Sequence, residues 1–181
     1  MSVYGAFELA KAFRTVRKNT VQIAQEIPED KYDFVPAPGA RSVSELLRHI
    51  AFAPGFQEDV HREKRLTTLQ GYDFSAHARV TQAKEREPRA KAEIVELLQR
   101  RGEDFAGWLE SLAPEFLAET VTDPMGQNPR SRLEMLMAAK EHEMHHRGQL
   151  MLIERMVGVV PHLTRQRLER QQAREQQAAR V

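Results

Sequence analysis

The stretch of sequence that decides the fold is HEMHHRGQ, residues 142–149. Its first and last histidines, His142 and His146, are four residues apart. An α-helix turns by about 100° per residue, so these two imidazoles lie about 40° apart around the axis and one turn from each other. Such a pair can chelate a single metal ion. The spacing therefore predicts a helix that carries a candidate metal site.

Apolar residues place this pair on the inner face of its helix. Met135 and Ile153 both lie about 20° from His142 on the helical wheel. The helix is expected to begin at Ser131, and Gly158 is a typical C-terminal stop. We therefore expect the two imidazoles to point into the protein.

Three further stretches have helical periodicity, and no alternating strand pattern separates them. They cover about residues 4–27, 42–60 and 88–112. We interpret residues 67–87 as a long connection with at most a helical turn, and residues 123–129 as a turn-rich loop. Long helices joined by long connections indicate an all-α protein, a four-helix bundle.

The helix that starts near residue 42 brings a third histidine to the interior. Ser42 and Glu45 form a capping box that fixes its start, and Pro54 is expected to kink it. His49 lies within about 40° of Phe56 on the helical wheel, so we place it on the inner face. Three buried imidazoles without partners would be costly, and a shared metal ion removes that cost.

The composition limits the chemistry. The chain has 181 residues, 27 Lys and Arg against 26 Asp and Glu, seven histidines and no cysteine. Disulfides, thiolate metal sites and a cysteine nucleophile are excluded. A metal must therefore be held by nitrogen and oxygen ligands. An all-imidazole set suits Zn²⁺ or Ni²⁺ best and leaves Fe²⁺ or Mn²⁺ open.

The ends of the chain indicate compartment and domain organisation. No apolar run approaches the ~20 residues that span a bilayer, and the charged N-terminus is unlike a secretory signal, so we expect a cytoplasmic protein. We assign residues 1–162 to one bundle domain and residues 163–181 to a polar tail rich in Arg, Gln and Glu. The basic side chains of the tail are the one feature that could indicate binding to nucleic acid, and we do not expect such a partner. We also expect no membrane partner.

The same letters match a competing motif, H-E-x-x-H of the zinc peptidases, with Glu143 as general base. Gln149 and Leu152 stand where the metzincin continuation requires a glycine and a third histidine. Glu143 and His145 each lie about 80° from the centre of the His142–His146 stripe. We therefore interpret Glu143 as a solvated charge and disfavour a peptidase.

Two segments resemble the signature regions of the DinB superfamily. They are SVSELLRHIA, residues 42–51, and KEHEMHHRGQLMLIERMVGVVP, residues 140–161. The resemblance implies a four-helix bundle with a divalent metal bound by His49, His142 and His146. It also implies thiol-dependent chemistry, because the family includes S-transferases that use bacillithiol and an isomerase that uses mycothiol. Many other members are regarded as metal-dependent hydrolases, and homodimers are common.

We therefore expect a metal-dependent enzyme that transfers a low-molecular-weight thiol to a small electrophile. The thiol must come from outside, because the chain has no cysteine. Gln149 lies about 40° from the histidine stripe, close enough to bond a ligand imidazole; it and Glu143 are the weak catalytic candidates. The alternatives are a hydrolase of a small substrate, a non-catalytic stress-related binding protein with a structural metal, and the disfavoured peptidase.

Overall fold

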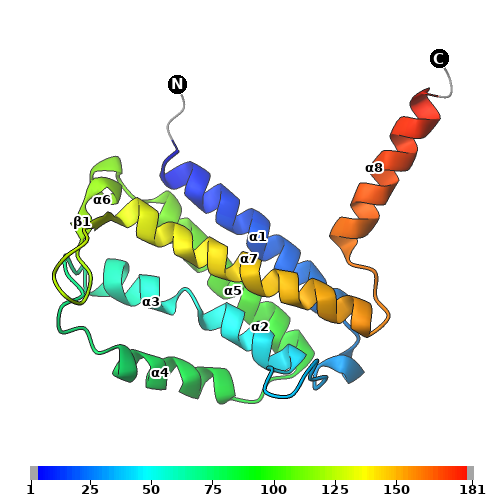
Figure 1. The fold of residues 1–181 in the computed structure, drawn as a ribbon, viewed down its shortest axis with the longest axis horizontal. Helices are drawn as coiled ribbons and strands as arrows, with labels where there is room; N and C mark the ends of the chain where they lie inside the picture. Colours follow the sequence, from blue (N-terminus) through cyan, green and yellow to red (C-terminus); the bar gives the residue numbers. More distant parts are fainter. Residues whose placement is uncertain (1–3, 179–181) are drawn as a thin grey trace.

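The computed structural model describes residues 4–178, and most of them lie in helices (Figure 1). In chain order the elements are α1 (Ala6–Glu26), the 3₁₀ turn η1 (Glu29–Lys31), α2 (Val43–Phe52), α3 (Gly55–Gln57), the π-helical turn η2 (Glu58–Glu63), α4 (Phe74–Arg86), α5 (Lys91–Glu110), α6 (Pro114–Ala118), β1 (Thr120–Val121), β2 (Arg130–Ser131), α7 (Arg132–Met156) and α8 (His162–Ala178).

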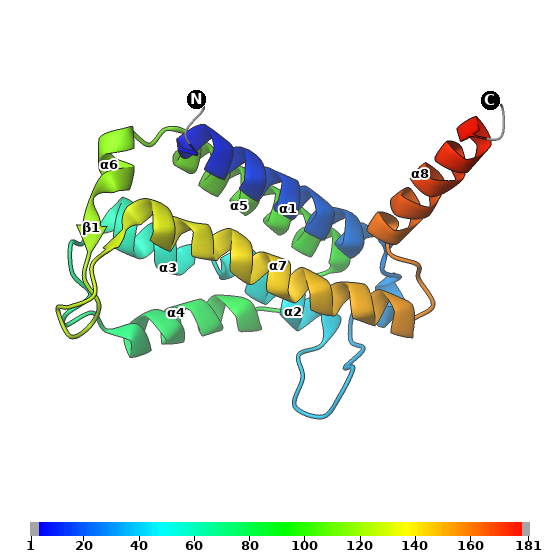
Figure 2. The same cartoon turned by 45° about the horizontal axis from the view of Figure 1, so that its top comes forward.

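Four of these helices form the bundle that the sequence predicted. Helix α1 packs against α5 and α7, and α2 packs against the same two helices from the other side. The C-terminal end of helix α4 packs against the outside of α2 (Figure 2). The fold is therefore an all-α four-helix bundle with long connections. Its two short strands pair antiparallel and only join α6 to α7.

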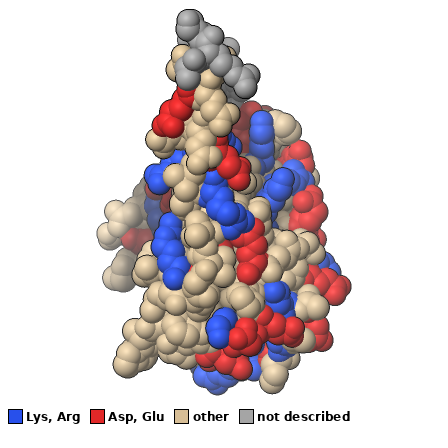
Figure 3. Space-filling model, turned by 90° about the vertical axis from the view of Figure 1, so that its right-hand side faces the viewer, with Lys and Arg blue, Asp and Glu red and all other residues tan. Residues whose placement is uncertain are grey.

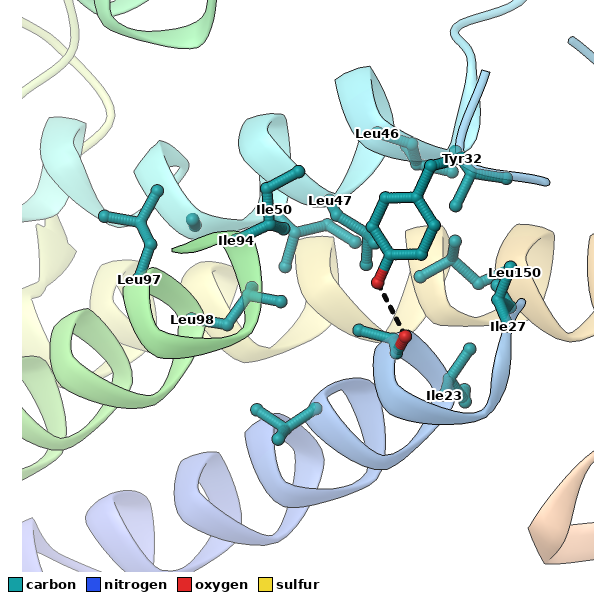
Figure 4. Packing of buried hydrophobic residues seen from close by; sticks show 14 of the residues in the cluster. Ile23, Ile27, Tyr32, Leu46, Leu47, Ile50, Ile94, Leu97, Leu98 and Leu150 are labelled. Carbon is teal, nitrogen blue, oxygen red and sulfur yellow. Dashed lines mark hydrogen bonds between the residues drawn. The ribbon is translucent and has the colours of Figure 1, made fainter. Parts of the chain in front are cut away.

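One end of the bundle is closed by an aliphatic core to which all four helices contribute (Figure 4). Leu47 and Ile50 of α2 meet Leu98 of α5, and all three are fully buried. The hydroxyl of Tyr32 donates a 2.6 Å hydrogen bond to the carbonyl of Ala24, which ties the loop after α1 to the bundle. Because α2 is anchored on this core, the side chains on its inner face are held in fixed positions.

The predicted features of α2 are confirmed. Ser42 accepts the N–H of Glu45, and the Glu45 carboxylate accepts the N–H of Ser42 in return. The helix ends at Phe52, just before Pro54, and the chain continues through α3 and the π-helical turn. The proline therefore breaks the helix after His49 has been placed on its inner face.

The prediction for residues 67–87 is wrong. The structure forms the thirteen-residue helix α4 there, with the Asp73 side chain accepting the N–H of Ala76 as its N-cap. None of its residues is buried, so the segment lacks the apolar periodicity from which a helix is normally predicted. The next helix, α5, begins at Lys91 rather than at Pro88.

The C-terminal segment forms a helix that projects from the bundle (Figures 1 and 2). Gly158, with φ +84°, ends α7 as expected. His162 is buried at the start of α8, and Arg165 pairs with Glu26 of α1. From Arg167 onward every described side chain is exposed. Basic and acidic side chains are interspersed on the face of the molecule from which α8 projects (Figure 3). No helix among residues 4–178 is both long and apolar enough to cross a membrane.

Candidate metal centre

Three imidazoles from two helices converge between α2 and α7. His49 comes from α2, and His142 and His146 come from successive turns of α7. The Nε2 atom of His142 lies 3.2 Å from Nε2 of His49 and 3.1 Å from Nε2 of His146. The structure therefore brings together the three side chains that the sequence had selected, with one ring nitrogen of each directed at the same point.

Two of the imidazoles are oriented by hydrogen bonds on their outer side. His49 Nδ1 lies 2.9 Å from Oε1 of Glu85, and His146 Nδ1 lies 2.8 Å from Oε1 of Gln149. Because a carboxylate oxygen and an amide oxygen only accept, both Nδ1 atoms carry the proton. Their Nε2 atoms then present lone pairs to the centre, the tautomer that metal-binding histidines adopt.

Burial favours the neutral form of the two imidazoles of α7. Desolvation, followed by the charges of His146 and His49, lowers the pKa of His142 to about 4. Desolvation also lowers the pKa of His146, although its bond to Gln149 acts in the opposite direction. The lowered pKa values disfavour the charged imidazolium forms of His142 and His146, and neutral imidazoles are the form that binds a metal. The donor set is therefore complementary to a metal cation.

The spacing also fits a cation. Tetrahedral Zn²⁺ with nitrogen ligands at 2.0–2.1 Å places neighbouring ligand atoms about 3.3 Å apart. The two Nε2 separations given above are close to that value. Among the described residues, these three histidines form the one group of His, Asp or Glu side chains with the geometry to hold a metal ion. The residues present fit such an ion.

Glu85 is the part of the site that the sequence analysis missed. It comes from α4, in the segment that the sequence predicts to be a connection, and its side chain is 14% exposed beside His49. The backbone carbonyl of Glu85 also accepts a 2.7 Å hydrogen bond from Nε of Arg48. The end of α4 is thus fastened to α2 at two adjacent residues. The Asp73 cap could have revealed the helix, but no local signal pairs Glu85 with His49.

The interpretation of Glu143 as a solvated charge is wrong. Its carboxylate is 2% exposed and accepts bonds from Nε and Nη2 of Arg17, both at 2.9 Å. The same guanidinium donates to the carbonyls of Leu98 and Ile50. Glu143 therefore links four helices through Arg17. It is engaged on the α1 side of α7, which rules it out as the general base of a peptidase.

Gln149 is placed as predicted, and His145 is not part of the cluster. The Gln149 amide accepts from His146 Nδ1 and lies 3.3 Å from Nε2 of the exposed His145. The two contacts agree on the orientation of the amide, because its nitrogen then donates to His145. Gln149 orients an imidazole of the cluster and is a positioning residue.

A cleft of about 830 Å³ opens beside this cluster. His146, Gln149 and Arg41 form its polar part. Apolar side chains form much of the remaining wall, among them Leu46, Leu152, Ile153 and Met156. A volume of this size accommodates a small organic molecule next to the histidine nitrogens.

The family of the chain follows from a comparison of sequences. A model of the DinB superfamily matches residues 12–150. The chain belongs to this superfamily. The matched DinB region begins inside α1 and ends inside α7, so it contains the three histidines, Glu85 and Gln149, whereas α8 lies outside it.

The relatives share the DinB fold. YjoA of Bacillus subtilis is 25% identical over 153 residues, which cover 83% of this chain and 90% of YjoA. The crystal structure of YjoA matches with a TM-score of 0.61, over 83% of this chain and 92% of that one. A DinB-like protein of Bacillus cereus is 17% identical, with a TM-score of 0.64 over 85% and 93% of the two chains.

A further solved structure shows the same bundle. YfiT of Bacillus subtilis is 16% identical and matches with a TM-score of 0.62, over 87% of this chain and 91% of YfiT. YfiT is described as a probable metal-dependent hydrolase with an unusual four-helix bundle topology. At this level of identity the likeness shows that the two proteins share a fold.

Proposed function

We propose that His49, His142 and His146 bind one divalent metal ion, Zn²⁺ or Ni²⁺, and that the protein uses it to transfer a low-molecular-weight thiol to a small electrophile. The observation that carries the proposal is the convergence of three Nε2 atoms, with the ring of His49 oriented from outside by Glu85 and the ring of His146 by Gln149. An ion held there supplies a Lewis acid, which lowers the pKa of a thiol or water that it binds.

The cleft favours thiol transfer over chemistry that needs a protein acid or base. Arg41, His146 and Gln149 are the residues with polar side chains among those that line it, and none of them is a carboxylate or a hydroxyl. Thiol transfer needs neither: the sulfur forms a bond to an electrophilic carbon, the leaving group departs with its electron pair, and the thiol proton passes to solvent. The apolar wall holds the electrophile and limits the access of water.

Hydrolysis of a small substrate is the second candidate. The specific observation in its favour is the likeness to YfiT, which is described as a probable metal-dependent hydrolase. The same three imidazoles would then serve to activate water. Leaving-group protonation would have to come from solvent, since the cleft-lining residues supply no acid other than His146.

The first test is the metal content of protein that was purified without an affinity tag. Alanine variants of His49, His142 and His146 should each lose most of the metal. His77→Ala, which changes a histidine of α4 that contacts Phe56 and Tyr72, should retain it. Less than about a tenth of an equivalent of any transition metal, with none taken up on titration, would exclude the site.

The second test separates the two reactions. The metal-loaded protein is incubated with 1-chloro-2,4-dinitrobenzene and a panel of small thiols, and in parallel with p-nitrophenyl acetate. Thiol-dependent release of chloride that is lost in His142→Ala supports transfer. Ester cleavage that needs the metal but no thiol supports the hydrolase instead and contradicts transfer.

A further inference from the structure

One charged side chain at the cleft takes no part in the histidine cluster or in the hydrogen bonds that orient it. Arg41 lies in the loop before α2, directly before the N-cap Ser42, and its side chain is exposed. It lines the large cleft together with His146 and Gln149. It also lines a smaller neighbouring cavity of about 450 Å³, together with Glu85. Arg41 therefore stands at the entrance to the histidine cluster.

The positive charge of Arg41 is not neutralised within the protein. The structure records no ion pair or hydrogen bond of its guanidinium with any residue in the range 4–178. The nearby carboxylates are already engaged, because Glu45 accepts the N–H of Ser42 and Glu85 faces His49. Arg41 and His146 line the same cleft, so the unpaired guanidinium and the histidine cluster open onto one space.

The lining of the cleft therefore combines a positive charge with an apolar wall. Apart from the imidazole of His146, Arg41 is the one titratable side chain among the residues that line it, so no acidic group balances its charge there. Leu152 and Met156 also line this cleft, and their side chains are 60% and 50% exposed. Apolar side chains left this open to solvent gain by contact with an apolar ligand.

We propose that Arg41 makes this cleft selective for small amphipathic anions, molecules that carry a carboxylate or a phosphate on an alkyl or aryl body. A guanidinium donates two parallel hydrogen bonds to either oxyanion, which no neutral or cationic group can accept in the same way. The apolar body then lies along Leu152 and Met156. This inference rests on the proposed function, because it takes the cleft as the substrate site, and it names the class of substrate.

The test compares ligands that differ only in their head group. Hexanoate, hexyl phosphate, hexanol and hexylammonium are titrated into the purified protein, with acetate as a head group that lacks the apolar body. Binding is followed by isothermal titration calorimetry, both on the metal-loaded protein and after removal of the metal. We expect the two hexyl anions to bind at least tenfold more tightly than hexanol or hexylammonium, and acetate to bind weakly.

Three variants test which side chains cause the preference for anions. Arg41→Gln should weaken binding of both anions about tenfold and leave hexanol unchanged. Arg86→Gln, which removes a charge that lines the smaller cavity but not the large cleft, is the matched control and should preserve the preference. Leu152→Asn should weaken hexanoate and hexanol by a similar factor, because it alters the wall and not the charge.

The possible outcomes also distinguish this inference from the proposed function. The inference is overturned if hexanol binds as tightly as hexanoate, or if Arg41→Gln keeps the full preference for anions. If the metal-free protein prefers anions through Arg41 while the loaded protein shows no reaction, the selectivity stands and the proposed activity fails. The metal content of Arg41→Gln should equal that of the unaltered protein, which separates anion binding from metal binding.

Discussion

The side chain of Arg17 passes so close to Gly102 of α5 that a methyl group at position 102 would lie 2.5 Å from its Cγ atom. The far end of Arg17 is fixed by its bonds to Glu143, so the stem cannot simply move away. The absence of a side chain at Gly102 is thus what allows Arg17 to cross from α1 into the middle of the bundle.

Gly102→Ala should therefore destabilise the fold. We expect a loss of about 1–3 kcal/mol in the free energy of unfolding, because overpacking must displace a buried arginine. Gly107→Ala is the matched control on the same helix: nothing lies within 4 Å of the added methyl group, so it should gain up to about 1 kcal/mol from helix propensity. Urea unfolding at pH 7 measures both. Equal effects of the two substitutions would contradict the packing argument.

Breaking the ion pair itself should cost more. Glu143→Gln leaves the guanidinium of Arg17 buried without a countercharge, for which we expect a loss of about 3–5 kcal/mol. The double variant Arg17→Met with Glu143→Leu should recover much of this loss, since neither charge then remains buried. Glu141→Gln, an exposed position on α7, should change stability by less than about 0.5 kcal/mol.

The Glu143→Gln variant also tests the peptidase hypothesis, through its activity on casein. If Glu143 were a general base, the protein would cleave casein, and Glu143→Gln would abolish that cleavage without affecting stability. We expect no cleavage by either protein. A stable, inactive Glu143→Gln variant of a protein that digests casein would reverse our conclusion about this residue.

Glu85→Gln should weaken metal binding. The carboxylate accepts the Nδ1 proton of His49 and makes that imidazole a better donor; loss of such an outer partner typically costs 10- to 100-fold in metal affinity. Competition titration with a Zn²⁺ indicator measures the change, and circular dichroism checks that α4 is retained. Glu87→Gln, which alters an exposed carboxylate that pairs with Arg89, should leave the affinity unchanged.

Glu154 should make stability depend on pH. This residue of α7 is fully buried, and neither of its carboxylate oxygens has a hydrogen-bond partner in the described part of the chain. Desolvation, with the charge of Glu26 adding to it, raises its pKa from 4.5 to about 7, against the weaker opposing pull of Arg165 and Arg155. The folded protein thus holds this proton more tightly than the unfolded chain.

Stability from this group is therefore present below about pH 4.5 and is lost as the pH rises toward 7. Glu154→Gln removes the titration, so relative to the unaltered protein it should gain about 2 kcal/mol between pH 5 and pH 8. Burying the amide of this variant changes the free energy of unfolding by the same amount at both pH values, so this cost cancels when the two pH values are compared. Thermal or urea unfolding of both proteins at each pH measures the gain, and a parallel pH dependence of the two proteins would refute the assignment.

Local sequence features sufficed for the parts of the fold that depend on neighbours along the chain. The four-residue spacing of His142 and His146 places both side chains on one side of α7. Pro54 follows just after the end of α2, the position where the sequence predicts an interruption of the helix. Both follow from the geometry of a single helix. The inward placement of His49 follows in the same way from the apolar residues around it.

The remaining features depend on contacts between distant residues. Helix α4 buries no residue, so its sequence lacks the periodic apolar signal, yet it supplies Glu85 to a histidine 36 positions earlier. The position of Glu143 relative to the histidine stripe does not reveal that α7 is also packed on its α1 side. The partner there, Arg17, is 126 positions away in the sequence.

The histidine cluster joins two points of the chain, His49 and His142, that are 93 positions apart, in a protein without cysteine. An ion held between α2 and α7 would therefore serve as a reversible cross-link where other proteins use a covalent one. Because only the folded chain assembles all three nitrogens, such a cross-link stabilises by mass action, by about 2.7 kcal/mol when the free ion is at a hundred times its dissociation constant. The lifetime of the folded protein would then rise and fall with the supply of metal.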